Sequence, residues 1–343
     1  ATVAASGAHS HVVVPDGGDL WEVFDRLGER QGEPTAGPGL YSQWKVMELA
    51  HGRGLKVLLD GQGADETLAG YFRYLPARLR DLAARGDVAG FLRLVGPVAR
   101  RLGWPATLAL TFEPWVPAEL VARLRRRFGQ GKDRVLADRL RRLPRPDLPA
   151  PPRGFPSGLA RQLAFDTLQR LLPSLLRYED RDSMAFSIET RLPFLDYRLV
   201  EFAFTLPDEQ RLDGDTTKAI LRRALADRIP RAVLERRDKK GFETPADAWL
   251  RGRHAGEARR RLLAPGPLHE WLDRRVLADE LEGFLAGRRA TGLQVWRWLS
   301  LEAWARRFVA RDARLAPPPA PAGAAGAHRS YAERARDLAG GGA

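Results

Sequence analysis

A short apolar run followed at once by a glycine-rich acidic turn constrains the fold of this chain most strongly. Residues 55–59 read LKVLL, which predicts a buried strand, and residues 60–66 read DGQGADE. The apolar run at residues 11–14 predicts another strand, and residues 40–51 have helical spacing. Strand, helix and strand in this order predict a parallel βαβ unit. We therefore expect an α/β fold with a parallel sheet whose strands are buried on both faces.

Length and composition indicate a large globular protein. At about 150 residues per domain, 343 residues predict two domains or one large one. We expect a partial α/β region, a proline-rich loop, a helical remainder and a disordered tail, in that order, at residues 1–143, 144–158, 159–315 and 316–343. No run of about 18 apolar residues is present, so we expect no membrane span. Without a secretory signal, the predicted compartment is the cytoplasm.

Helical periodicity dominates after residue 66. Apolar spacing predicts a helix at residues 159–177, which Pro173 should kink or interrupt. A second helix is predicted at residues 293–309, and its tryptophans should pack in the core. Thr216 or Thr217 should cap a further helix that runs to Arg228.

The charge of the chain is strongly basic. There are 56 Lys and Arg residues against 43 Asp and Glu residues, which gives a net charge of +13. A charge of this size raises the possibility of a nucleic-acid partner. The arginines are spread along the sequence and form no stripe interleaved with aromatic residues, so we interpret them as solvated helix faces and expect no nucleic acid. The absence of cysteine excludes disulfides, zinc ribbons and a cysteine nucleophile.

The turn at residues 60–66 carries side chains suited to binding a ligand. In an open α/β sheet, ligands bind beyond the carboxyl ends of the strands. Gly61 and Gly63 allow the backbone to turn tightly and approach a bound group. Asp65 and Glu66 should begin the next helix, where a carboxylate either caps the helix or holds Mg²⁺. A purely structural turn with a capping acid has the same composition.

Two later segments are also rich in functional groups. Residues 177–196 alternate charges beside an apolar turn, and Glu189 and Arg191 are two residues apart, so they cannot pair along one helix face. Residues 236–242 form a basic loop before a helix that Pro245 opens, and lysines suit phosphate oxygens. A salt-bridged surface and a surface turn are the structural alternatives for these segments.

Taken together, the segments resemble one protein family. Residues 57–71, 176–207 and 236–250 resemble, in order and wording, the synthetase half of the glutamine-dependent asparagine synthetases. Residues 294–304 resemble the closing helix of that family, so the resemblance covers about residues 10–310. The phrase RLPFLD at residues 191–196 is more specific than a lone glycine-rich loop. The resemblance implies a sheet of the ATP-pyrophosphatase type, here incomplete, followed by a large helical portion.

The same resemblance implies an adenylating ligase that uses ATP and Mg²⁺. The side-chain carboxylate of aspartate would attack the α-phosphorus of ATP, pyrophosphate would leave, and ammonia from glutamine would displace AMP to give asparagine. The family motif places Mg²⁺ on Asp65 and the leaving pyrophosphate on Lys239. It also places Gln62 and Glu66 with Lys239 in the catalytic set, and it assigns ATP and substrate binding to Asp60, Gly61, Gly63, Glu189, Arg191 and Asp196.

Two features depart from the family pattern. The sequence has neither the Ser-Gly-Gly-x-Asp-Ser pyrophosphate loop nor the N-terminal glutaminase domain with its terminal cysteine. We therefore expect that an N-terminal portion is missing, and that this polypeptide alone binds ATP weakly and makes no asparagine. The second departure is Gln62, where family members place an acid and β-lactam-forming relatives a tyrosine. A neutral amide cannot act as a general base, so the base lies elsewhere, ammonia needs none, or the acceptor differs.

The alternatives follow from these departures. One is an amide synthetase with an internal or peptide amine as acceptor, as in β-lactam or lasso-peptide cyclisation. From a different class, the chain would be a non-catalytic basic binding module, or a pseudoenzyme half that pairs with a separately encoded partner. The expected small-molecule partners are aspartate, ATP and ammonia, and a homodimer is one possible assembly.

Overall fold

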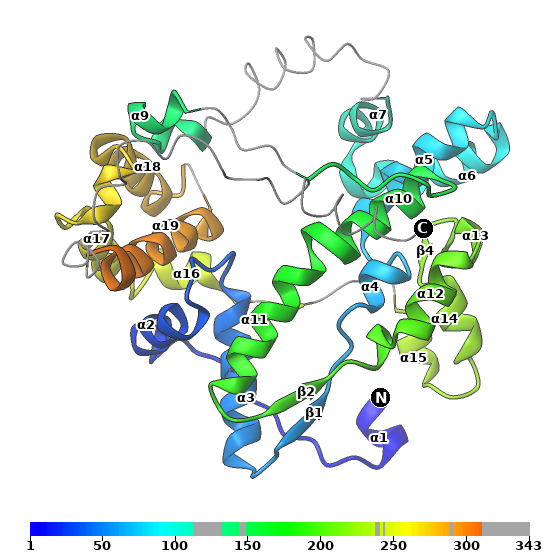
Figure 1. Cartoon of the computed structure of the whole chain (residues 1–343), viewed down its shortest axis with the longest axis horizontal. Coiled ribbons are helices and arrows are strands. Elements are labelled where there is room, and N and C mark those ends of the chain that lie inside the picture. Colours follow the sequence, from blue (N-terminus) through cyan, green and yellow to red (C-terminus); the bar gives the residue numbers. More distant parts are fainter. Residues whose placement is uncertain (113–131, 144–148, 237–240, 243, 289–290, 311–343) are drawn as a thin grey trace, which may run out of the picture.

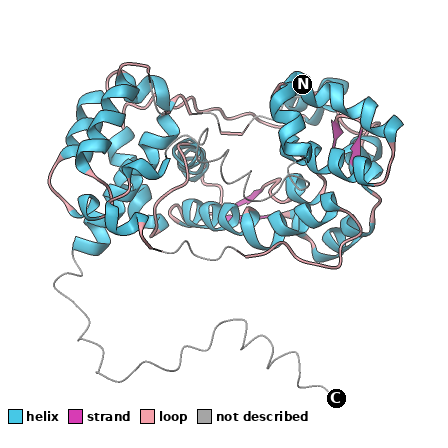
Figure 2. Ribbon diagram, turned by 90° about the horizontal axis from the view of Figure 1, so that it is seen from above, coloured by secondary structure: helices cyan, strands magenta, loops and turns pink. Residues whose placement is uncertain are grey.

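The computed structural model of the chain is mostly helical (Figures 1 and 2). It describes residues 1–112, 132–143, 149–236, 241–242, 244–288 and 291–310. The predicted tail at residues 316–343, part of the predicted proline-rich loop, and Lys239 lie outside the described residues. The helices form two groups, and α11 (Leu172–Met184) runs between them beside a small parallel sheet (Figure 1).

The parallel sheet stands at one edge of the molecule (Figure 1). It pairs β1 (Val57–Leu59) with β2 (Glu189–Arg191), in a register that sets Val57 opposite Glu189. The backbone N–H of Asp60 donates to the carbonyl of Arg191 at 3.0 Å, so the pairing continues beyond β1. The predicted strand is thus confirmed at residues 57–59, and its neighbour is parallel. The expected burial of the sheet on both faces is wrong, because Val57 and Leu59 are 44% and 75% exposed. Because parallel strands end at the same edge, residues 60–66 and 192–196 are brought together.

The expected pairing of β1 with residues 11–14 is wrong. Residues 11–14 form no strand, and Val12 and Val14 are 76% and 82% exposed. β1 pairs instead with β2, which lies about 130 residues further along the chain. An apolar run forms a strand only where a neighbour satisfies its backbone hydrogen bonds, and residues 11–14 have no such neighbour among the described residues. The predicted βαβ unit is therefore not formed.

The first helical group surrounds the larger hydrophobic core. It contains α2 (Leu20–Gln31), α3 (Gly39–Gly52), α11, α16 (Ala246–Arg251), α17 (Ala255–Leu263), α18 (Arg274–Leu285) and α19 (Gly292–Trp304). Leu20, Val23, Phe24 and Leu27 are buried on one face of α2, at the spacing of an amphipathic helix. The predicted helices at residues 40–51 and 293–309 are confirmed, the latter as α19 followed by a π-helical turn at Ala305–Val309.

The second helical group has its own smaller core. Its helices are α4 (Ala64–Thr67), α5 (Leu75–Ala84), α6 (Val88–Leu102), α7 (Trp104–Phe112), α10 (Gly158–Phe165), α12 (Tyr197–Thr205), α13 (Asp208–Arg211), α14 (Ala219–Ala224) and α15 (Arg231–Leu234). The guanidiniums of Arg78 and Arg211 both pair with the buried Asp208, at 3.2 Å each. Shorter helices lie at α1 (Thr2–Ser6) and α9 (Asp138–Arg141), with 3₁₀ turns at Phe72–Tyr74, Lys132–Val135, Pro193–Leu195 and Pro267–Glu270.

Two predicted helix boundaries have different outcomes. The helix predicted at residues 159–177 is interrupted, as expected, because α10 passes into a π-helical turn at Asp166–Arg170 before α11 begins. Pro173 lies in the first turn of α11, where its missing N–H costs no hydrogen bond. The predicted cap at Thr216 or Thr217 is wrong: both form β4 (Thr216–Thr217), antiparallel to β3 (Leu212–Asp213). The following helix, α14, begins after Lys218 and ends at Ala224.

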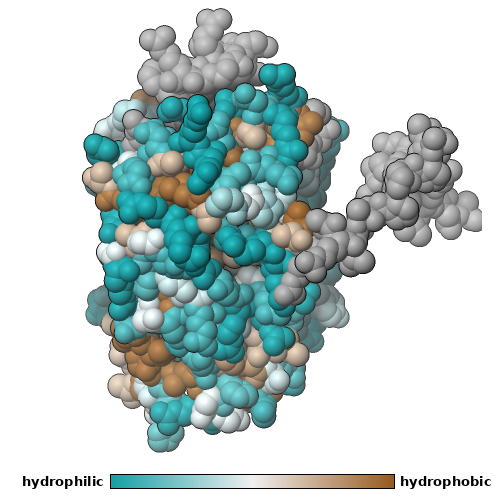
Figure 3. Space-filling model, turned by 90° about the vertical axis from the view of Figure 1, so that its left-hand side faces the viewer, coloured by the Kyte–Doolittle hydropathy of each residue, from teal (hydrophilic) through white to brown (hydrophobic). Residues whose placement is uncertain are grey.

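Several surface arginines pair with nearby acids. Arg259 pairs with Glu282 at 2.7 Å, and Arg139 pairs with Glu270 at 3.3 Å. Figure 3 shows the face formed by the first helical group as mostly hydrophilic, with smaller hydrophobic patches. This pattern agrees with solvated helix faces rather than a binding stripe. Within the described residues, no helix has the length and apolar character needed to cross a bilayer.

Candidate active site

The turn after β1 packs against the turn after β2. Gly63 precedes α4 with a φ of 87°, a left-handed conformation that glycine adopts at little cost. A Cβ atom at Gly63 would lie 2.1 Å from Cδ2 of Leu195, in the turn after β2. A Cβ atom at Gly61 would meet no described atom within 4 Å. Close packing therefore requires glycine at position 63, whereas the side of the turn at Gly61 is open.

Asp65, the predicted Mg²⁺ ligand, lies in the first turn of α4 and is 8% exposed. Its Oδ1 pairs with Nζ of Lys218 at 2.9 Å. Gly70 leaves room for this pair, because a Cβ atom there would lie 1.8 Å from Oδ1 of Asp65 and 2.5 Å from Cε of Lys218. The prediction that Asp65 begins the helix after the turn is confirmed. The sequence gave no indication that Lys218 is its neighbour.

Glu66 is held in the wall of the turn. Its side chain is 1% exposed, and the hydroxyl of Tyr71 donates to its Oε1 at 2.9 Å. Burial raises the pKa of Glu66, and the hydrogen bond from Tyr71 acts in the opposite direction. Burial, with the nearby Glu66 carboxylate, also raises the pKa of the Tyr71 hydroxyl. The Glu66 carboxylate is therefore held by a neutral donor, the hydroxyl of Tyr71.

Glu179 is a member of the site that the sequence analysis did not select. It lies on α11 and is 1% exposed. Burial and the nearby Asp60 carboxyl raise the pKa of Glu179 well above its usual range, while the Gln62 amide acts to lower it. Glu179 belongs to the charged segment at residues 177–196, but its burial depends on how α11 packs, which the sequence pattern does not reveal.

The predicted site residues on β2 and after it have local partners. Nε of Arg191 donates to Oε1 of Glu189 at 2.8 Å, and both side chains are exposed. The two residues pair because they lie on a strand and not on a helix, and alternate residues of a strand share a face. Asp196 caps α12 by accepting the backbone N–H of Arg198 at 3.0 Å, and its contacts with Arg198 lower its pKa to about 2. Arg191 and Asp196 lie at the edge of the sheet that carries the β1 turn, whereas Glu189 lies at the other end of β2, opposite Val57.

The acidic groups near the turn are compatible with Mg²⁺ that arrives bound to a nucleotide. Among the described residues, no cluster of three or more His, Asp or Glu side chains is arranged to hold a metal ion. Mg²⁺ typically takes one or two protein carboxylates and completes its shell with water and phosphate oxygens. The Asp65 carboxylate can serve as one such ligand. The predicted role of Lys239 stays a prediction, because that residue lies outside the described part of the chain.

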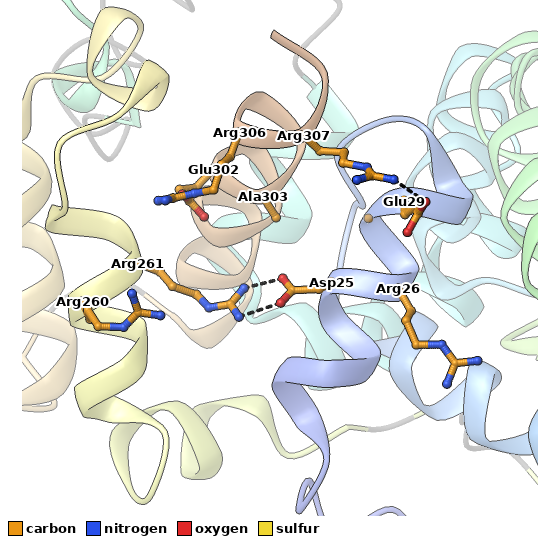
Figure 4. A pocket seen from close by; sticks show the side chains of 10 residues that line it. Asp25, Arg26, Glu29, Arg260, Arg261, Glu302, Ala303, Arg306 and Arg307 are labelled. Carbon is orange, nitrogen blue, oxygen red and sulfur yellow. Dashed lines mark hydrogen bonds and ion pairs between the residues drawn. The ribbon is translucent and has the colours of Figure 1, made fainter. Parts of the chain in front are cut away.

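A separate cavity lies within the first helical group. It has a volume of about 420 Å³ and is lined by residues of α2, α17 and the end of α19 (Figure 4). Nη2 of Arg261 donates to Oδ2 of Asp25 at 2.8 Å, and Arg307 pairs with Glu29 on the same side of α2 (Figure 4). None of the predicted site residues in the described ranges lines it. Arg261 and Arg307 join their segments to α2, whereas Arg260 pairs within its own helix.

Comparison with known proteins identifies the family. Residues 1–306 match the family described as Asparagine synthase. A protein of Mycobacterium tuberculosis and Mycobacterium bovis, provisionally named as a glutamine-hydrolysing asparagine synthetase, is 28% identical over 298 residues, which are 81% of this chain and 43% of the relative. Asparagine synthetase 3 (glutamine-hydrolysing) of Bacillus subtilis is 34% identical over 122 residues, 36% of this chain and 20% of the relative. The chain spans less than half the length of these relatives, and it belongs to the asparagine synthase family.

Proposed function

We propose that this protein is an ATP-dependent ligase that forms asparagine. The aspartate side-chain carboxylate attacks the α-phosphorus of ATP, the bond to pyrophosphate breaks, and an acyl-adenylate is formed. Ammonia then attacks the acyl carbon, a C–N bond forms, and AMP leaves with the electron pair of the broken C–O bond. The observation that supports this proposal most directly is the turn at residues 60–66, which sets Asp65 and Glu66 beyond the carboxyl end of a parallel strand.

Each residue of the turn has a proposed task. The backbone at Asp60, Gly61 and Gly63 forms the surface against which ATP lies. Asp65 would hold Mg²⁺, which neutralises charge that develops on the pyrophosphate. Gln62 and Glu66 line the reacting end, and Lys239 meets the leaving pyrophosphate. Glu189, Arg191 and Asp196 form the β2 side of the site. ATP and Mg²⁺ are the proposed cofactors.

Residues 1–343 by themselves are expected to bind ATP weakly and to make no asparagine. The sequence lacks the Ser-Gly-Gly-x-Asp-Ser loop and contains no cysteine for glutamine hydrolysis. In the proposal, glutamine-derived ammonia and the pyrophosphate loop come from a glutaminase domain and an upstream segment outside these residues. The same proposal holds if these parts are supplied by a separately encoded partner chain.

A second candidate function uses an amine other than ammonia. Gln62 favours it, because a neutral amide occupies a position where related enzymes carry an acid or a tyrosine. The adenylation step would be the same, and an internal or peptide amine would displace AMP. Supplying ammonia and candidate amines separately to the enzyme-bound acyl-adenylate distinguishes these acceptors.

The proposed function is tested by aspartate-dependent exchange of labelled pyrophosphate into ATP. The protein is expressed from the start codon of its reading frame, and the 343-residue chain is assayed beside it. We expect Asp65→Asn to lower the exchange rate at least about 10-fold and to raise the Mg²⁺ concentration needed for half the maximal rate. Asp213→Asn serves as the control, since Asp213 has a side chain that is 75% exposed. Full exchange activity in Asp65→Asn would refute the site, and robust exchange by the 343-residue chain alone would refute its predicted incompleteness.

A further inference from the structure

The cavity in the first helical group is walled mainly by charged side chains, and arginines outnumber acids among them (Figure 4). Three of its lining residues are acids and five are arginines: Arg26, Arg260, Arg261, Arg306 and Arg307. Its volume of about 420 Å³ lies in the range of pockets that hold small molecules. The cavity therefore has both the size and the side chains of a site for a charged ligand.

One arginine is held rigidly in the cavity wall. The side chain of Arg261 is 13% exposed, and its Nη2 donates to Oδ2 of Asp25 at 2.8 Å. Its Nε donates to Oε1 of Glu257, also at 2.8 Å, and its guanidinium lies over the ring of Trp21, 4.7 Å from the centroid. A guanidinium has five N–H donors in a planar fork, which is more than these two acids accept. Arg261 can therefore bind a further anionic group without moving.

Two further arginines diverge from an irregular turn at the end of α19. Residues Ala305–Val309 form a π-helical turn that carries Arg306 and Arg307. Arg307 pairs with Glu29 on α2, whereas Arg306 pairs with Glu302 of α19 (Figure 4). Turns of this kind are rare and occur frequently at functional sites. Here the turn places one arginine on each side of the cavity.

A glycine in the cavity wall leaves space that the helix itself does not need. Gly28 lies in the interior of α2, where glycine costs about 1 kcal/mol of helix stability relative to alanine. Within 4 Å, a Cβ atom there would meet only Cβ of Ala303, at the ordinary contact distance of 3.9 Å. Packing among the described residues therefore gives no reason for glycine at this position, whereas an open cavity does.

The lining as a whole is positively charged. Its five arginines exceed its three acids by two. Glu22, which pairs with Arg26 at 3.8 Å, lies outside the lining, and so does Glu257, which Arg260 and Arg261 share. Clefts lined by one sign of charge concentrate ions of the opposite sign. An anion inside the cavity therefore meets more positive than negative side chains.

We propose that this cavity binds a small anion that carries two or more phosphate or carboxylate groups. The fork of a guanidinium binds either group through paired hydrogen bonds. The largely buried Arg261 would hold one anionic group, and Arg260 and Arg306, whose side chains are 65% and 52% exposed, would close on another at the rim. This inference does not rest on the proposed function, because no residue assigned to the ligase reaction in the described ranges lines the cavity.

The test is calorimetric titration of the protein expressed from the start codon of its reading frame, with inorganic pyrophosphate and with citrate. We expect saturable binding with a dissociation constant below about 1 mM. Arg260→Gln should weaken binding about 10-fold, because it removes a charged donor at the rim while Glu257 stays paired with Arg261. Gly28→Leu should weaken binding by about 30-fold or more, because its side chain fills the space beside Ala303.

The matched controls lie on α17, outside the cavity. Arg259→Gln makes the same charge change at an arginine that pairs with Glu282, and Gly256→Leu enlarges an exposed helical glycine whose Cβ would meet no atom within 4 Å. Both should change the dissociation constant less than about twofold, and circular dichroism checks that each variant is folded.

Tighter binding of pyrophosphate would assign a phosphate ligand, and tighter binding of citrate a carboxylate ligand; either result supports the site. If neither anion binds, or if neither Arg260→Gln nor Gly28→Leu weakens binding, the proposal is wrong. An equal loss in Arg259→Gln and Arg260→Gln would also overturn it, because the attraction would then come from the overall charge of the protein. If Gly28→Leu does not fold, the comparison of these two arginine variants decides alone.

Discussion

Replacing Gly70 with alanine perturbs the Asp65–Lys218 pair without touching either charge. The new Cβ would lie 1.8 Å from Oδ1 of Asp65 and 2.5 Å from Cε of Lys218, so the pair has to open by more than 1 Å to reach van der Waals distance. Overpacking of this kind costs about 1–3 kcal/mol. The pair is partly shielded, since the side chains of Lys218 and Asp65 are 25% and 11% exposed, so weakening it adds about 1 kcal/mol. The expected loss is about 2–4 kcal/mol in the free energy of unfolding.

The assay is urea unfolding followed by tryptophan fluorescence and circular dichroism. Gly61→Ala is the matched control, because it lies in the same turn and its Cβ meets no described atom within 4 Å. We expect the control to remain within about 0.5 kcal/mol of the unaltered protein. If Gly70→Ala unfolds at the same urea concentration as Gly61→Ala, the close approach at Gly70 does not hold and the Asp65–Lys218 geometry is wrong.

Two further predictions concern buried groups. The folded state raises the pKa of Glu179 above its ordinary 4.5. The unaltered protein should therefore lose stability relative to Glu179→Gln as the pH rises from about 4.5 toward 8, by up to about 4 kcal/mol, and show little difference below pH 4.5. Unfolding measured across this pH range tests the prediction, and a stability difference that does not change with pH would contradict the raised pKa. Phe284→Ala should lower the free energy of unfolding by about 3–5 kcal/mol, because Phe284 is fully buried and lies under the Arg251 guanidinium. The control is Leu92→Ala, which should lower it by less than about 0.5 kcal/mol, because Leu92 is 65% exposed. Denaturant midpoints measure both changes.

Local sequence patterns predicted the helices and one strand, but not the partner of that strand. The residues of α3 and α19 repeat apolar positions at helical spacing, so the signal lies within each segment. β2 reads Glu-Thr-Arg and has no apolar run. It is a strand because β1 supplies its hydrogen-bond partners from more than 100 residues away. Residues 11–14 show the converse, a strand-like run with no neighbour to pair with in the described part.

In the candidate site, too, the local features were predictable from the sequence and the long-range contacts were not. The turn at residues 60–66 and the start of α4 were predictable, because a glycine-rich acidic sequence directly follows an apolar run. Lys218 and Glu179 were not, since their places near the turn depend on α14 and α11 packing across the chain. The charged segment that contains Glu179 reads equally well as a salt-bridged surface. Only its burial distinguishes the two interpretations.

Backbone conformation gives an independent reason to regard this region as functional rather than as an ordinary turn. Among the described residues, the non-glycine positions with positive φ are Ala69 at 56°, Ser187 at 55° and Lys218 at 51°. Ala69 follows α4, and Lys218 contacts Asp65. Ser187 lies two residues before β2, at the end of the sheet away from the turn. A left-handed residue other than glycine costs about 1–2 kcal/mol, and such strain is retained mainly where a site requires it. Two of the three positions, Ala69 and Lys218, therefore place unfavourable local energy at the segment that carries the Asp65–Lys218 pair. A turn whose purpose was only to connect β1 to α4 would gain stability by losing all of these features.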